Sequence, residues 1–263
     1  MEIVEIFLSK LSAPEALYKE VGTKLGAGEI SGEEQLEGAL LSCDTQREYH
    51  LYISDEDIVN ETVESIIAVF RKCEKSCGRF SVETHVDEFL NLIDDKARMT
   101  HYSKPRSLVH RDGDLHPTVH IWLIKRKDMG IYALLQKRSS EKQINPDCFD
   151  VSAAGHVSQG EEFRHAAVKE LREELGLSVS GDQLELIGLH NQLYTNDEVR
   201  DNELSAVYLY RGKVDTDKLV LRSSEVSEVG WVEIDELLSV MKNEDIPNCI
   251  SLDELSMIKK AVF

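Results

Sequence analysis

The sequence predicts an α/β protein with two domains: a small, acidic, helix-rich α/β domain at residues 1–104 and a larger domain at residues 105–263. Helical and strand-like segments alternate up to about residue 100, and strands become more frequent beyond the polar segment His101–Pro105. In the second domain, a glutamate-rich helix and two C-terminal helices accompany a mixed sheet. That combination predicts an α/β/α sandwich.

The first domain shows clear signals for the start and end of its helices. Pro14 occupies the first turn of a helix that ends before the glycines Gly26 and Gly28. We expect helices at 13–25, 33–41, 55–75 and 86–97, and strands at 50–53 and 80–82. No residue pattern here indicates chemistry. We therefore expect an interaction module or a dimerisation module, the second of which would make the protein a homodimer.

The second domain is predicted from short apolar runs that favour strands. These runs lie at 118–124, 131–136, 148–152, 184–194 and 204–210, and two helices are expected at 235–241 and 252–262. The glutamate-rich helix lies between the third and fourth strands. Gly176 follows its last turn, where a helix commonly ends in a left-handed residue.

Composition limits the partners and the location of the protein. A formal net charge of −19 argues against a nucleic acid or an anionic membrane surface as a partner. The five cysteines are odd in number and scattered, which fits reduced thiols. The N-terminal segment lacks the basic region and the cleavage site of a signal peptide. We expect a cytoplasmic protein.

Three glutamates of the helix, Glu170, Glu173 and Glu174, stand at positions i, i+3 and i+4. This spacing brings their carboxylates to one side of the helix, where like charges repel. A hard divalent cation would neutralise them. The alternative for these residues alone is a solvated, glutamate-rich helix face.

The segment that contains this helix resembles the Nudix box, the signature of the Nudix hydrolases. The matching residues are Gly155, Glu161, Lys169, Glu170, Leu171, Glu173, Glu174, Gly176 and Leu177, with the spacing of that motif. The resemblance implies a Nudix fold and a Mg²⁺ site, with Mn²⁺ as an alternative. It assigns the ligands to Glu170, Glu173, Glu174, the Gly155 carbonyl and Glu203. Lys169 stands where the motif carries arginine, and it can pair with Glu161 but cannot form a bidentate fork.

A second resemblance points to one branch of this superfamily, the type I isopentenyl-diphosphate isomerases. Five residues follow the order of the metal-binding positions of those enzymes, namely His110, His116, His156, Asp201 and Glu203. The resemblance implies that they form a second metal site or a substrate site. The isomerases carry an essential cysteine just before the glycine–histidine pair, whereas this chain has Ala154. Since alanine cannot exchange a proton, hydrolysis is favoured over isomerisation.

These observations lead to a functional expectation with two alternatives. We expect a Mg²⁺-dependent pyrophosphohydrolase acting on a nucleoside-diphosphate-type or related small diphosphate compound, with Glu173, Glu174 and Glu203 as catalytic residues and Glu174 or Glu203 as the base. Lys137 and Arg138 are expected to meet phosphates and Tyr194 to stack on a planar group. The alternatives are an isopentenyl-diphosphate isomerase and a non-catalytic nucleotide-binding or regulatory module.

Overall fold

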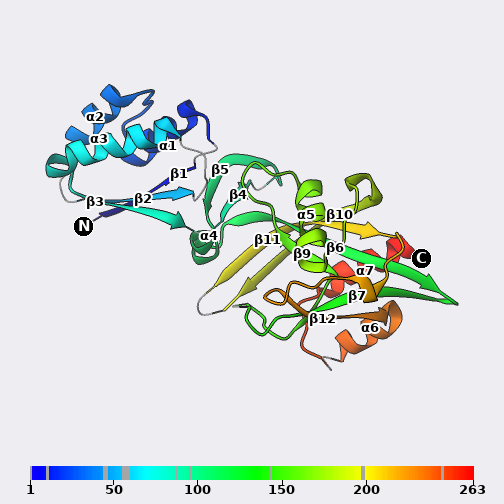
Figure 1. Ribbon diagram of the computed structural model, residues 1–263. Helices are drawn as coiled ribbons and strands as arrows, with labels where there is room; N and C mark the ends of the chain where they lie inside the picture. Colours follow the sequence, from blue (N-terminus) through cyan, green and yellow to red (C-terminus); the bar gives the residue numbers. More distant parts are fainter. Residues whose placement is uncertain are drawn as a thin grey trace. The chain divides into compact units, whose positions relative to one another are not determined.

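The computed structural model describes residues 2–9, 12–43, 47–54, 60–86, 88–94, 96–142, 144–196, 199–243 and 246–263 (Figure 1). It divides into two units. The first comprises the described parts of Met1–Leu92, Met99–Asp112 and Ser158–Gly160, and the second those of Ile93–Arg98, Gly113–Val157 and Glu161–Phe263. The division predicted between residues 104 and 105 stays a prediction.

The first unit contains a parallel sheet in the order β1-β2-β3, formed by β1 (Glu2–Leu8), β2 (Arg47–Ser54) and β3 (Arg79–Val86). Figure 1 shows three helices on one side of this sheet: α1 (Pro14–Leu25), α2 (Glu33–Leu41) and α3 (Glu61–Cys77). A short helix, α4 (Arg106–Asp112), also belongs to this unit. The predictions of α1 and α2 are confirmed to within one residue, whereas β1 was not predicted.

The start of α3 has a clear local cause. Asn60 precedes the helix, and its Oδ1 accepts hydrogen bonds from the backbone N–H groups of Thr62 (3.0 Å) and Val63 (3.3 Å). Such a cap satisfies donors that have no partner inside the helix. The predicted start at Asp55 falls in residues 55–59, which lie outside the described part of the chain.

The helix predicted at 86–97 is wrong. The structure has β4 (Phe89–Ile93) there, which pairs with β5 (Met99–Pro105) in a two-stranded sheet. The backbone turns between them because the Asp94 carboxylate accepts from the N–H groups of Lys96 and Arg98, and because Ala97 adopts a left-handed φ of 59°. Phe89, Leu90 and Ile93 are buried, so packing outweighs the local helical pattern.

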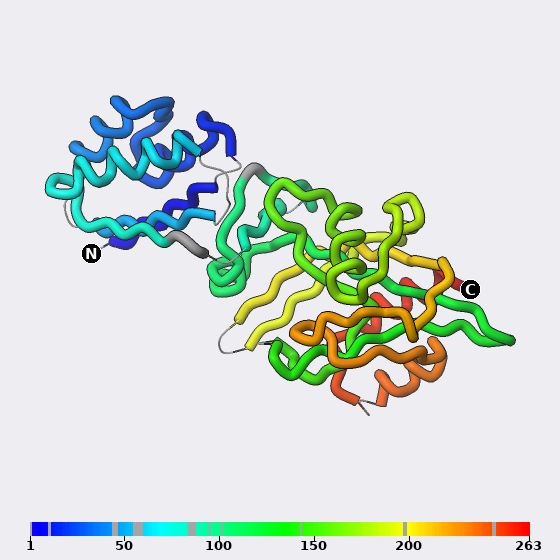
Figure 2. Tube along the Cα trace, in the orientation of Figure 1, coloured from blue at the N-terminus to red at the C-terminus, as the bar shows by residue number. Residues whose placement is uncertain are grey.

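The second unit is built on a mixed sheet in the order β10-β11-β6-β7-β12. Its main strands are β6 (Leu115–Lys127), β7 (Gly130–Arg138), β10 (Leu184–Thr195), β11 (Arg200–Tyr210) and β12 (Val226–Glu233). The short strands β8 (Phe149–Asp150) and β9 (Ala153–His156) pair with β7 and β6. β11 is parallel to β6, and the other described pairs are antiparallel. In Figure 2, β10 and β11 run side by side in yellow. The predicted mixed sheet is confirmed.

Helices cover the two faces of this sheet, as the predicted sandwich requires. Along β6, Val119, Ile121 and Leu123 pack with α5 (Phe163–Leu175). The alternate residues Trp122 and Ile124 pack with α6 (Ile234–Lys242) and α7 (Leu252–Val262). This period of two is the expected pattern of a strand buried on both faces. Two short 3₁₀ turns, Gly181–Gln183 and Thr216–Lys218, complete the unit. No helix in the described residues is both long and apolar enough to span a membrane.

The end of α5 provides a test of this packing. Gly176 has φ +65°, and a Cβ there would lie 2.9 Å from the Cβ of Val220. Gly176→Ala should therefore lower the free energy of unfolding of the second unit by about 1–2 kcal/mol. The control is Gly230→Ala, where an added Cβ meets no atom within 4 Å. Urea denaturation followed by tryptophan fluorescence measures this unit, because Trp122 and Trp231 both lie in it. Equal midpoints for the two variants would contradict the prediction.

Candidate functional site

The backbone of Gly155 and the side chain of Glu170 touch each other. Gly155 lies on β9, which pairs with β6 at Val119, and α5 packs over the same region. A Cβ at Gly155 would lie 2.3 Å from Cδ of Glu170. Glycine at this position therefore leaves room for the Glu170 carboxylate, which a Cβ would displace. The contact places a carboxylate directly against the main chain of β9.

Glu174 is the buried carboxylate of this group, with 5% of the residue exposed. Its Oε2 accepts a hydrogen bond from the Ala154 backbone N–H at 3.1 Å and another from Nε2 of Gln136 at 3.3 Å. Burial and the neighbouring Glu170 carboxylate raise the Glu174 pKa to about 8. Two carboxylates held close together in a desolvated place are suited to a divalent cation, for which oxygen atoms are the preferred ligands.

Lys169 occupies the place of the expected arginine and forms the predicted ion pair. Its Nζ lies 3.1 Å from Oε2 of Glu161 and 3.6 Å from Oε1 of Glu170. One ammonium group thus contacts two carboxylates, although it cannot present two parallel N–H groups to either of them. The pair connects the loop before α5 to the helix itself.

Glu173 is placed differently from its two neighbours. Its side chain is 38% exposed, and its carboxylate oxygens lie 3.8 Å from the guanidinium groups of Arg172 and Arg222. The structure therefore brings Glu170, Glu174 and Gly155 together and places Glu173 at their margin. We refer to Gly155, Glu161, Lys169, Glu170 and Glu174 as the helix cluster.

A second group, the histidine cluster, consists of His116, His156, Asp201 and Glu203. The imidazole rings of His116 and His156 are stacked with centroids 5.2 Å apart. Nε2 of His116 lies 3.4 Å from Oδ1 of Asp201, and Nε2 of each histidine lies 4.0 Å from Oε1 of Glu203. The register of β6 with β9 and β11 explains this convergence, because Thr118 pairs with His156 and Glu203 with His116. His110 is buried in α4 and belongs to the first unit.

Burial and charge act in opposite directions within the histidine cluster. Burial lowers the pKa of His116, but Asp201 and Glu203 outweigh it, and the net pKa is above the ordinary value. Burial and the Asp201 carboxylate raise the pKa of Glu203, while His120 and His116 oppose that rise. The cluster thus combines carboxylates and imidazoles whose charges depend on one another.

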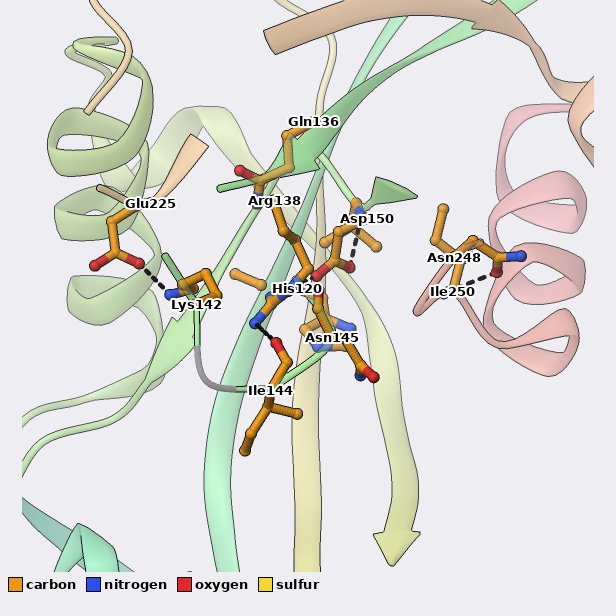
Figure 3. Close-up of polar contacts among 12 residues, drawn as sticks. His120, Gln136, Arg138, Lys142, Ile144, Asn145, Asp150, Glu225, Asn248 and Ile250 are labelled. Atoms are coloured by element: carbon orange, nitrogen blue, oxygen red, sulfur yellow. Dashed lines mark hydrogen bonds and ion pairs between the residues drawn. The ribbon is translucent and has the colours of Figure 1, made fainter. Parts of the chain in front are cut away.

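Three further residues were predicted to contact substrate. Arg138 uses its guanidinium to fasten a loop: it donates to Asp150 at 2.9 Å, to the Asn145 carbonyl at 3.1 Å and to the Ile144 carbonyl at 3.0 Å (Figure 3). Lys137 is partly exposed, with Nζ 3.7 Å from Glu228. Tyr194 lies on β10 and pairs in register with Asp201, a residue of the histidine cluster.

Sequence reasoning did not single out four polar residues near these clusters: His120, Gln136, Asp150 and Glu254. All four are buried. Gln136 holds Glu174, and Asp150 holds Arg138. His120 on β6 and Glu254 on α7 contact each other, with Nδ1 and Oε2 2.9 Å apart. Each of these residues is polar and lies in an otherwise apolar strand or helix face. That pattern predicts a buried polar residue that needs a hydrogen-bond partner, but it does not identify the partner.

The family model described as "NUDIX domain" matches residues 114–251, which is more than half of the chain. The chain belongs to the Nudix family. The α/β/α sandwich and the motif on α5 are thus those of a Nudix domain, and the predicted family is confirmed.

Among curated proteins, the chain is similar to an uncharacterized Nudix hydrolase of Clostridium acetobutylicum, with 34% identity over 60% of this chain and 76% of that one. It is also similar to Nudix hydrolase 3 of Arabidopsis thaliana, with 36% identity over 60% of this chain and 21% of that one, so it spans about a fifth of this longer relative. An isopentenyl-diphosphate Delta-isomerase of Mycolicibacterium vanbaalenii matches at 29% identity over 57% of this chain and 80% of that one. A solved structure, DR0079 from Deinococcus radiodurans, has 20% identity and a TM-score of 0.49, with 64% of this chain and 98% of that one covered. The predicted relation to the isomerase branch is confirmed.

The raised pKa of Glu174 predicts how stability depends on pH in the absence of metal. A carboxyl group whose folded pKa is raised from 4.5 to about 8 is ionised more easily in the unfolded chain, so folding loses stability as pH rises between those values. In EDTA, Glu174→Gln should therefore be more stable than the native protein at pH 8, by more than about 1 kcal/mol, and the difference should vanish near pH 4.5. Denaturation at several pH values measures it.

Glu173→Gln is the matched control, because this neighbouring glutamate is partly exposed. Its stability should follow that of the native protein to within about 0.5 kcal/mol. Stability curves for Glu174→Gln and the native protein that run parallel from pH 4.5 to pH 8 would contradict the burial of Glu174 as an ionisable group.

Proposed function

We propose that this chain is a Mg²⁺-dependent pyrophosphohydrolase that cleaves a diphosphate bond in a nucleoside-diphosphate-type or related small diphosphate compound. The observation that supports it most directly is the convergence of Glu170 and Glu174 with the backbone of Gly155. Nudix domains are typically metal-dependent, and these groups fit a divalent ion because two carboxylates lie together where burial makes their combined charge unfavourable.

The proposed ligands are Glu170, Glu174 and the Gly155 carbonyl, with Glu173 at their margin and Mn²⁺ as an alternative ion. When bound, the ion would offset charge on the diphosphate oxygens and lower the pKa of a coordinated water. Gln136 and the Ala154 N–H orient Glu174, and Lys169 connects Glu161 to Glu170. Each proposed ligand thus has a neighbour that fixes its position.

For the general base we favour Glu203, with Glu174 in the role of ligand. Oε2 of Glu174 already accepts two hydrogen bonds, whereas Glu203 keeps 17% of its side chain exposed beside His116 and His156. The raised pKa of Glu203 brings a carboxylate closer to the range in which proton uptake near neutral pH is efficient.

Hydrolysis is favoured over isomerisation by Ala154. Its methyl side chain cannot donate or accept a proton, and its backbone N–H is engaged with Glu174. Isomerisation of an isopentenyl group requires proton addition at one carbon and removal at another. The ion pair of Lys169 with Glu161 also favours a catalytic role over a purely regulatory one, because the support expected from the arginine position is present.

We also propose that His116, His156 and Asp201 of the histidine cluster hold a second divalent metal ion. Atoms bound to one ion at about 2.1 Å lie roughly 3.0–4.2 Å apart, and the 3.4 Å between Nε2 of His116 and Oδ1 of Asp201 is in that range. One ligand atom each from His116, His156 and Asp201 lies within 4.8 Å of the others. Imidazole and carboxylate together suit borderline ions such as Zn²⁺, Mn²⁺ or Co²⁺.

A phosphate-release screen tests the proposed hydrolysis. With Mg²⁺, the native protein should release phosphate or a phosphorylated product from at least one nucleoside diphosphate derivative. Glu170→Gln and Glu174→Gln should each lower kcat at least about a hundredfold, because several kcal/mol of charge stabilisation depends on the metal. Glu185→Gln is the control, since this exposed glutamate on β10 pairs with Arg211 outside both clusters.

Two results would redirect the assignment. Conversion of isopentenyl diphosphate to its allylic isomer without phosphate release would establish the isomerase instead. Tight nucleotide binding without turnover across the panel, with either Mg²⁺ or Mn²⁺, would favour a regulatory module. Equal turnover by the native protein and Glu174→Gln would exclude the proposed ligand set.

A separate measurement tests the second metal site. Titration with Co²⁺ should give the visible absorption of a nitrogen-ligated ion, and His156→Ala should weaken that binding by about tenfold or more because one of the imidazole ligands is removed. His165→Ala is the matched control, because His165 is exposed on α5. Identical titrations for the two variants would show that the histidine cluster does not bind this ion.

A further inference from the structure

A buried acidic residue of the last helix reaches the centre of the sheet. Glu254 is 1% exposed, and its two carboxylate oxygens each have a partner on β6. Oε2 lies 2.9 Å from Nδ1 of His120, and Oε1 accepts from Nε1 of Trp122 at 2.8 Å. Ser251 caps α7 and accepts from the Glu254 N–H at 3.2 Å, so the backbone of this residue is also fixed.

The side chains of His120 and Glu254 lie at ion-pair distance, with Nδ1 and Oε2 2.9 Å apart. Burial lowers the pKa of His120, but Glu254 more than compensates and raises it to about 9. Burial raises the pKa of Glu254, yet His120 and Trp122 lower it below its ordinary value. Replacing a buried ion pair with apolar residues is often neutral or stabilising, so such a pair is weak evidence for a role in stability. A role at the neighbouring site explains it better.

The far side of the imidazole faces the strand that carries Glu203. Nε2 of His120 lies 3.4 Å from Oγ of Ser205, and Ser205 and Thr118 are joined by a hydrogen bond of 2.8 Å. Ser205 is two residues from Glu203, so both side chains point to the same face of β11. His120 also lowers the pKa of Glu203, against the effects of burial and Asp201. The His120 side chain therefore connects α7 to the strand that carries Glu203.

We propose that His120, held by Glu254, is a positioning residue of the candidate site: it connects α7 to β11 through Ser205, two residues from Glu203. The inference rests on the proposed membership of Glu203 in the site. It extends the site beyond residues 114–251, because Glu254 lies on the helix that follows the Nudix match. The other charged or titratable groups that act on this pair are Glu203 and Asp150, which act on His120, and His190, which acts on Glu254.

The test compares Glu254→Gln with Trp122→Phe in the full-length protein. Both remove a hydrogen bond at the Glu254 carboxylate, but only the first removes the charge that holds His120. At pH 7.5 the ¹⁵N shifts of His120, assigned with His120→Gln, should be those of an imidazolium in the native protein and in Trp122→Phe, and of a neutral ring in Glu254→Gln. Mn²⁺ affinity should fall about tenfold in Glu254→Gln, as for residues that orient metal ligands, and less than twofold in Trp122→Phe.

Two outcomes would overturn the proposal. One is equal loss of Mn²⁺ affinity in both variants, which would indicate a packing effect. The other is native affinity in Glu254→Gln, with only its melting temperature reduced. If the native protein binds no Mn²⁺, the metal proposal fails and the link between His120 and Glu203 is decided by NMR alone. Glu203→Gln should then shift the His120 resonances and Glu185→Gln should not, and His120 resonances unchanged by Glu203→Gln would overturn the inference.

Discussion

The contact of Glu170 with the backbone of Gly155 is the constraint around which the second unit is arranged. A carboxylate can lie against the main chain of β9 only if β9 carries no side chain there and if α5 is held close to the sheet. The buried residues Ala166, Ala167 and Leu171 hold α5 close to Val119 and Ile121 of β6. The left-handed Gly176 then ends the helix immediately after Glu174. Fold and site therefore depend on the same close packing.

The acidic composition of the chain affects the electrostatics of the candidate site. The net charge of −19 is unfavourable for binding a diphosphate, and the basic side chains close to the site are largely engaged with carboxylates. Lys169 contacts Glu161 and Glu170, Arg138 contacts Asp150, and His120 contacts Glu254. These cations balance the protein's own charge. In the proposed function, bound divalent ions would supply the positive charge for the diphosphate.

Much of the fold could be predicted from local pattern. α2 and α7 have their predicted bounds, and at α7 the Ser251 side chain caps the predicted start by accepting from the Asp253 and Glu254 N–H groups. The segment at 86–97 could not be predicted, because burial of β4 outweighs its helical pattern. β1 was missed although Val4, Ile6 and Leu8 alternate, since an isolated short strand is stabilised by distant pairing partners.

Some features of the candidate site could likewise be predicted from the sequence, and others could not. Glu170, Glu174 and Gly155 belong to one contiguous motif and could be named from sequence. The place of Glu173 beside Arg222 could not be, because it depends on a residue that follows 49 positions later in the chain. The partnership of Gln136 with Glu174 and that of His120 with Glu254 likewise depend on tertiary packing, and no local spacing encodes them.

The hydrogen bond between His120 and Glu254 joins residues 134 positions apart. Contacts of such long sequence separation form late, because a large loop must close first. During synthesis Glu254 also emerges after every other residue of the site. During synthesis, His120 has no Glu254 partner until α7 has been made. If His120 positions the site as proposed, the site is complete only after α7 docks on β6.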